Sequence, residues 1–129
     1  MKDNLYHYRA TVVRVVDGDT VDVMLELGFN VSLKERVRLY GINAPEARTR
    51  DKSEKVKGLA AKDFVVEWTE DHADEIVIVT RIDKRGKYGR VLGTIMTESG
   101  ENLNELMIKE GHAVEYFGGK RKRHTTGAQ

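Results

Sequence analysis

The sequence predicts an α+β fold that is mainly β, with five strands in a small, strongly curved sheet or barrel and two or more appended helices. Two observations lead to this expectation. Five segments are rich in β-branched residues or alternate between apolar and polar residues, and two segments repeat apolar residues at helical spacing. Their order is three strands, a helix, two strands and a helix, which lacks the regular alternation of a doubly wound parallel sheet.

The first three predicted strands lie in the first 40 residues. Residues 8–16 are rich in β-branched side chains, and residues 20–27 and 33–40 alternate between apolar and polar positions. A turn is expected at Gly28 to Asn30, between the second and third strands. The residues expected to face the core from these two strands are Val21, Val23, Leu25, Leu27, Leu33, Val37 and Leu39.

A change of period after residue 51 predicts the first helix. In residues 52–69 apolar residues recur every three or four positions, and Asp51 with Glu54 resembles a capping signal. Residues 75–81 and 89–97 return to strand patterns. The residues expected on the apolar face of the helix are Val56, Leu59, Ala60, Phe64 and Trp68.

A second, shorter helix is predicted over residues 102–111. Asn102 stands at the N-cap position with Glu105 three residues later, and Gly111 ends the pattern. The inward residues should be Leu103, Leu106 and Met107.

Length and composition describe a single domain. We expect residues 1–117 to form it and residues 118–129, which include four contiguous basic residues, to be a flexible basic tail. The chain contains no cysteine, which excludes disulfides, thiolate metal ligands and a cysteine nucleophile. Neither a secretory signal nor a membrane span is recognisable, so we expect a monomeric cytoplasmic protein without a membrane partner, or a secreted one if a leader was removed.

Charged residues near strand ends suggest a chemistry. Asp19 and Glu46 lie where strands pass into loops, and Arg38 and Arg90 lie within or at the start of strands. Carboxylate and carbonyl oxygens suit a hard cation such as calcium, and guanidinium groups suit a phosphate. A carboxylate that does not bind the metal can act as a general base on water. These are the groups that phosphodiester hydrolysis needs.

Three motifs together resemble those of the staphylococcal nuclease (thermonuclease) family. They are DGDTV at 17–21, RLYGINAPE at 38–46 and KYGR at 87–90, and the resemblance covers about residues 8–117. It implies a five-stranded OB-type barrel that carries helices. It also implies a calcium-dependent nuclease that cuts DNA and/or RNA, preferably single-stranded, with little sequence specificity and leaves 3′-phosphate ends.

The resemblance implies roles for four charged residues. Asp19 matches the family's calcium-binding aspartate, and Arg38 matches the arginine that contacts the scissile phosphate. Glu46 matches the glutamate assigned as general base or as organiser of the attacking water. Arg90 matches the second arginine, which stabilises the transition state.

Further positions carry over to the metal and to the bound nucleotide. Asn43 and Ala44 stand where the best-known member has a second calcium-binding aspartate and a threonine, so weaker calcium binding is expected. Lys87 and Tyr88 match residues that hold a terminal phosphate, and Tyr116, or the phenylalanine after it, takes the place of a nucleotide-stacking tyrosine. The alternative is a non-catalytic OB-type module that binds single-stranded nucleic acid.

Overall fold

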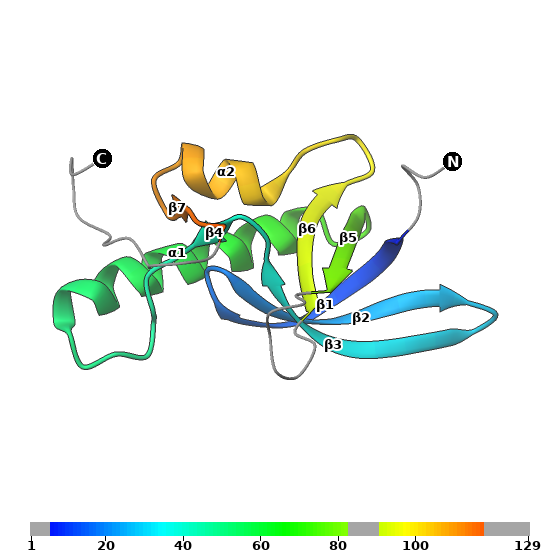
Figure 1. The fold of residues 1–129 in the computed structure, drawn as a ribbon, viewed down its shortest axis with the longest axis horizontal. Helices are drawn as coiled ribbons and strands as arrows, with labels where there is room; N and C mark the ends of the chain where they lie inside the picture. The colour runs from blue at the N-terminus through cyan, green and yellow to red at the C-terminus, as the bar shows by residue number, and fades with distance from the viewer. Residues whose placement is uncertain (1–5, 83–90, 118–129) are drawn as a thin grey trace.

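The computed structural model describes residues 6–82 and 91–117, which form a closed β-barrel with two helices (Figure 1). The predicted mainly β α+β fold with a five-stranded OB-type barrel is confirmed. The strand order around the barrel is β1-β2-β3-β6-β5, and every neighbouring pair is antiparallel except β3 with β6. The barrel strands are β1 (His7–Asp17), β2 (Thr20–Gly28), β3 (Val31–Leu39), β5 (Ile76–Ile82) and β6 (Val91–Thr97).

Alternating apolar residues fill the barrel, as the sequence pattern predicts. Val21, Val23 and Val37 are completely buried. The prediction is wrong for Leu27 and Leu33, which are exposed. The reason is that β6 pairs only with the last three residues of β3, so the tip of the β2–β3 hairpin projects beyond the barrel (Figure 1).

The helix α1 (Lys52–Asp71) begins where the capping signal predicts, and Asp51 accepts hydrogen bonds from the amides of Ser53 and Glu54. Trp68 is buried as predicted and Phe64 is partly buried, but the rest of the buried face differs from the predicted one. The buried residues are Gly58, Ala61, Val65, Trp68 and Thr69, whereas Val56, Leu59 and Ala60 are exposed. The N-terminal half of α1 extends past the barrel, and Val56 and Leu59 in this half are exposed (Figure 1).

The short helix α2 (Leu103–Lys109) packs on β6 and carries a buried polar residue. Asn102 caps it, and Leu103 and Met107 are buried as predicted, with Leu106 partly buried. The Nδ2 atom of Asn104 donates to the carbonyls of Tyr40 at 2.9 Å and Gly93 at 3.0 Å. Asn104 thereby fixes the segment that leaves β3 against the barrel.

A second, two-stranded sheet has no counterpart in the predicted elements. It pairs β4 (Ile42–Asn43) with β7 (Val114–Glu115), and the Tyr116 amide donates to the Gly41 carbonyl at 2.8 Å beside it. Strands of two residues are too short to show an alternating pattern. The predicted tail at 118–129 and the first two residues of the strand predicted at 89–97 lie outside the described residues. Within the described part of the chain, neither helix has the length and apolarity to cross a membrane.

His72, at the C-terminal end of α1, links this helix to the segment before α2. Its Nδ1 atom donates to the Trp68 carbonyl at 2.8 Å, and its Nε2 atom lies 3.2 Å from a carboxylate oxygen of Glu101. The Trp68 indole donates to the other oxygen of Glu101 at 3.3 Å. The hydrogen bond to the Trp68 carbonyl is the main cause that raises the pKa of His72, and the charges of Glu101 and Glu75 add to it.

We expect His72 to make stability depend on pH. Because its pKa is raised by folding, its contribution is fully present below the unfolded value of about 6.5 and is lost as the pH rises through the folded value. The variant His72→Gln should therefore lower the melting temperature more at about pH 6 than at about pH 8. His7→Gln, at an exposed site on β1, serves as the control in thermal melts. An equal loss at both pH values for His72→Gln would contradict the expectation.

Candidate active site

The turn between β1 and β2 positions Asp19. Gly18 at its centre packs so closely that an added Cβ would lie 2.8 Å from the Cβ of Ala61 on α1 and 3.1 Å from that of Ala44. Real Cβ atoms essentially never approach as closely as the first of these distances, so the site has no room for a side chain. The β1–β2 turn therefore packs between α1 and the segment that follows β4.

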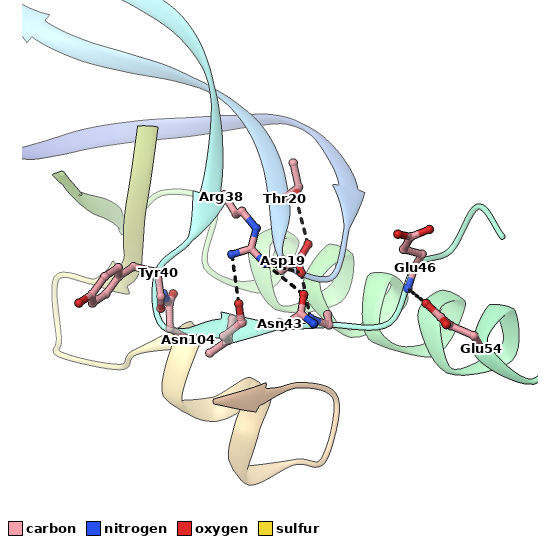
Figure 2. A network of polar contacts seen from close by, with 10 residues as sticks. Asp19, Thr20, Arg38, Tyr40, Asn43, Glu46, Glu54 and Asn104 are labelled. Carbon is pink, nitrogen blue, oxygen red and sulfur yellow. Dashed lines mark hydrogen bonds and ion pairs between the residues drawn. The ribbon is translucent and has the colours of Figure 1, made fainter. Parts of the chain in front are cut away.

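Asp19 is almost fully buried, yet its carboxylate has several polar partners. Its Oδ1 atom accepts from the Thr20 hydroxyl at 3.0 Å, and Oδ2 accepts from the Ala44 amide at 2.9 Å. The Arg38 Nη2 atom lies 3.6 Å from the same Oδ2 (Figure 2). Both carboxylate oxygens of this nearly buried side chain are thus accounted for by donors.

Arg38 stands at the centre of the polar network in Figure 2. Its Nη1 atom donates to the Ile42 carbonyl at 3.3 Å, and Nη2 donates to Oδ1 of Asn43 at 3.1 Å. The guanidinium also lies 5.6 Å from the centre of the Tyr116 ring. A fifth of the Arg38 side chain stays exposed.

The structure therefore brings together several residues that the sequence selects from distant segments. Asp19, Arg38, Asn43 and Ala44 are joined by hydrogen bonds or ion pairs, and Tyr116 borders Arg38. The predicted Lys87, Tyr88 and Arg90 lie outside the described residues.

Glu46 lies on the segment between β4 and α1, directly after Pro45. Its side chain is exposed, and its amide donates to a carboxylate oxygen of Glu54 at 3.1 Å. The next amide, that of Ala47, donates to Asp17 at 3.1 Å. In Figure 2 the Glu46 carboxylate points away from Glu54. The backbone of Glu46 is thus held while its carboxylate remains accessible.

Asp19 and its neighbours carry oxygen atoms of the types that could hold a hard divalent cation. Asp19 offers a carboxylate, Asn43 an amide oxygen and Ala44 a backbone carbonyl, which are the ligand types that calcium prefers. The described residues contain no group of three or more acidic, histidine or cysteine side chains that could hold a metal.

Three residues that organise the site were not assigned to it from the sequence. The sequence pattern indicates Asp17 only as part of the DGDTV motif and Glu54 only as part of a helix cap, and it does not indicate Asn104. All three act by binding backbone groups, which leaves no pattern in a sequence. Gly58, inside the predicted helix, is a residue that weakens a helix interior and therefore indicates tight packing at that position.

The sequence is similar to a known protein family and to several named proteins. The family model described as staphylococcal nuclease homologue matches residues 36–129. The chain is 32% identical over 115 residues to "Endonuclease YhcR" of Bacillus subtilis, covering 85% of this chain and 9% of that protein. It is 34% identical over 108 residues to an "Uncharacterized endonuclease" of Escherichia coli, covering 81% of this chain and 59% of the relative.

A third relative carries a nuclease name. The chain is 33% identical over 119 residues to "Micrococcal nuclease" of Shigella flexneri, covering 84% of this chain and 59% of that protein. The chain thus spans less than two thirds of the length of each of these relatives.

Proposed function

The chain belongs to the family of staphylococcal nuclease homologues, and on this basis we propose that it is a calcium-dependent nuclease. It hydrolyses phosphodiester bonds of DNA and/or RNA, preferably single-stranded, with little sequence specificity and leaves 3′-phosphate ends. Family membership and the nuclease names of its relatives support a nuclease-type function with a nucleic acid substrate.

The observation that carries the proposal is the cluster around Arg38. The Arg38 side chain is partly exposed, and its guanidinium lies beside a buried carboxylate and an amide oxygen at the end of β3. Guanidinium donors match the oxygens of a phosphate, and a neighbouring carboxylate can hold a cation that binds the same group.

In the proposed reaction the attacking water lies next to the Glu46 carboxylate. Glu46 accepts a proton as the water oxygen bonds to phosphorus, and the bond from phosphorus to the 5′ oxygen breaks. The leaving oxygen takes a proton from solvent, so the products are a 3′-phosphate and a 5′-hydroxyl. Arg38 donates to the phosphate oxygens, where negative charge increases in the transition state.

Other groups complete the proposed site. A bound calcium ion, held by Asp19, Asn43 and the Ala44 carbonyl, would supply charge neutralisation at the phosphate. Arg90 is the proposed second arginine, and Lys87 and Tyr88 are proposed to hold a terminal phosphate. Tyr116 is proposed to contact a base by stacking, because its ring borders Arg38.

Incubation of the protein with end-labelled single-stranded DNA or RNA, with calcium or with a chelator, tests the proposal. We expect fragments only with calcium, and a phosphatase that removes 3′-phosphates should change their mobility. Binding without calcium-dependent fragments would contradict the proposal and favour the alternative of a non-catalytic binding module.

Asn43 allows a test of the proposed calcium site, because its neutral side-chain amide can be replaced by a charged carboxylate. Asn43→Asp adds a negative charge beside Asp19, and binding of hard cations depends strongly on ligand charge. The variant should reach half-maximal cleavage at roughly tenfold less calcium than the wild type. Asn30→Asp, at the exposed hairpin turn, adds the same charge far from the site and should leave the titration unchanged. An unaltered requirement in Asn43→Asp would exclude this residue as a ligand.

A further inference from the structure

Three carboxylates hold the backbone of the segment that carries Glu46. The amide of Ala44 donates to Asp19 at 2.9 Å, that of Glu46 to Glu54 at 3.1 Å and that of Ala47 to Asp17 at 3.1 Å. The residue between the first two amides is proline, which has no N–H to donate. Every amide from residue 44 to residue 47 is therefore accounted for by a carboxylate.

Of these carboxylates, Glu54 is the one that binds Glu46 itself. It lies in the first turn of α1, where Asp51 already caps the helix by accepting from two amides. In a reciprocal capping box the third residue of the helix would bind the amide of the cap residue. Here the Glu54 carboxylate instead accepts from Glu46, across the loop (Figure 2). A hydrogen bond to an ionised acceptor is stronger than one between neutral groups.

Gly58, one turn further along α1, packs against the backbone of the same residue. An added Cβ would collide with the Glu46 carbonyl and would lie 2.6 Å from the Ala47 amide nitrogen. The Glu46 backbone thus rests directly on the helix. Gly58 is buried there and has no room for a side chain.

We propose that Glu54 and Gly58 are positioning residues that fix the Glu46 carboxylate relative to the phosphate. The inference rests on the proposed function, because it assumes that Glu46 acts on water. Glu54 binds the Glu46 amide and Gly58 contacts its carbonyl, so the peptide groups on both sides of the Glu46 side chain are fixed to one rigid helix. A shift of about 1 Å in a reacting group can lower turnover by about 10²-fold.

Kinetics of Glu54 variants test the proposal. Glu54→Ala should lower kcat by about 10–100-fold with little change in KM, because the substrate contacts of Arg38 remain. Glu54→Gln keeps an oxygen that can accept the Glu46 amide and should restore most of the turnover. Glu67→Ala, at an exposed site on the same helix, is the matched control and should behave as the wild type. Wild-type turnover in Glu54→Ala would overturn the proposal.

Gly58→Ala offers an independent variant at the other contact. Alanine favours a helix more than glycine does, so the substitution alone should not weaken α1. It should nevertheless lower kcat by about 10–100-fold, because the Glu46 backbone must move away from the helix. Unchanged turnover in this variant would show that the close approach does not position Glu46.

Amide hydrogen exchange gives a readout that needs no catalysis. In Glu54→Ala the Glu46 amide should exchange faster, whereas the Ala47 amide, held by Asp17, should keep its wild-type rate. An unchanged Glu46 rate would overturn the positioning role. Failure of the proposed function gives different results. The wild type would then not cleave nucleic acid, or Glu46→Gln would remain active. Either result would overturn the catalytic part of the inference, whatever the amide exchange rates.

Discussion

Replacement of Glu46 by glutamine should lower kcat by about 10²–10⁴-fold, the range found when a general base is lost. Glutamine has nearly the same size and can keep the backbone hydrogen bond to Glu54, but its amide cannot take a proton from water. The measurement is the single-turnover rate of cleavage of a short DNA at saturating calcium, compared between Glu46→Gln and the wild type. KM should change little, because Glu46 is not assigned a role in holding the substrate.

The Glu46→Gln variant should keep its stability, because the side chain is exposed and surface substitutions usually change unfolding free energy by less than about 0.5 kcal/mol. Glu70→Gln, exposed on α1, removes the same charge elsewhere and should remain fully active. Turnover near the wild-type level in Glu46→Gln would mean that the water is activated by another group.

The second large effect is expected for Arg38→Ala, which should lower kcat by about 10²–10³-fold or more, equivalent to about 3–4 kcal/mol of transition-state stabilisation. Arg38→Lys should be nearly as defective, since an ammonium group cannot reproduce the planar pair of donors. Asp19 keeps its hydrogen bonds from Thr20 and Ala44 in both variants, so we expect the protein to fold.

The same strand supplies a matched control for Arg38. Arg36 forms a side-chain ion pair with Asp22 on β2 at 2.8 Å, but it is far more exposed than Arg38. Arg36→Ala should therefore retain most of the activity, and thermal melts of both variants should report a folded protein. Equal losses in the two variants would point to a general effect of charge on substrate binding rather than to a role of Arg38 at the phosphate.

The barrel could be predicted because strand alternation directly records which face is buried. The pattern cannot show where a strand leaves the barrel, which is why Leu27 and Leu33 are exposed despite a regular alternation. The same limit applies to α1, where Val56 and Leu59 have helical spacing but lie in the part of the helix that extends beyond the sheet. Periodicity identifies an element, and its neighbours decide which face is covered.

Part of the candidate site could likewise be predicted from the sequence, and part could not. Asp19, Arg38 and Glu46 could be selected because they lie in motifs of a known family. The contacts of Glu54 and Asn104 could not, because each binds backbone groups of segments that are distant along the chain. The backbone groups that these two side chains reach depend on how α1 and α2 pack on the rest of the chain. No local sequence pattern shows that packing.

The parallel pairing of β3 with β6 has a consequence for synthesis of the protein. These strands are separated along the chain by α1 and β5, so the barrel cannot close until β6 has been made. Non-local pairing of this kind slows folding, typically to milliseconds or longer. Tyr116 follows later still. A chain still growing on the ribosome would thus carry Arg38 before β6 can close the barrel and before Tyr116 can lie beside the guanidinium.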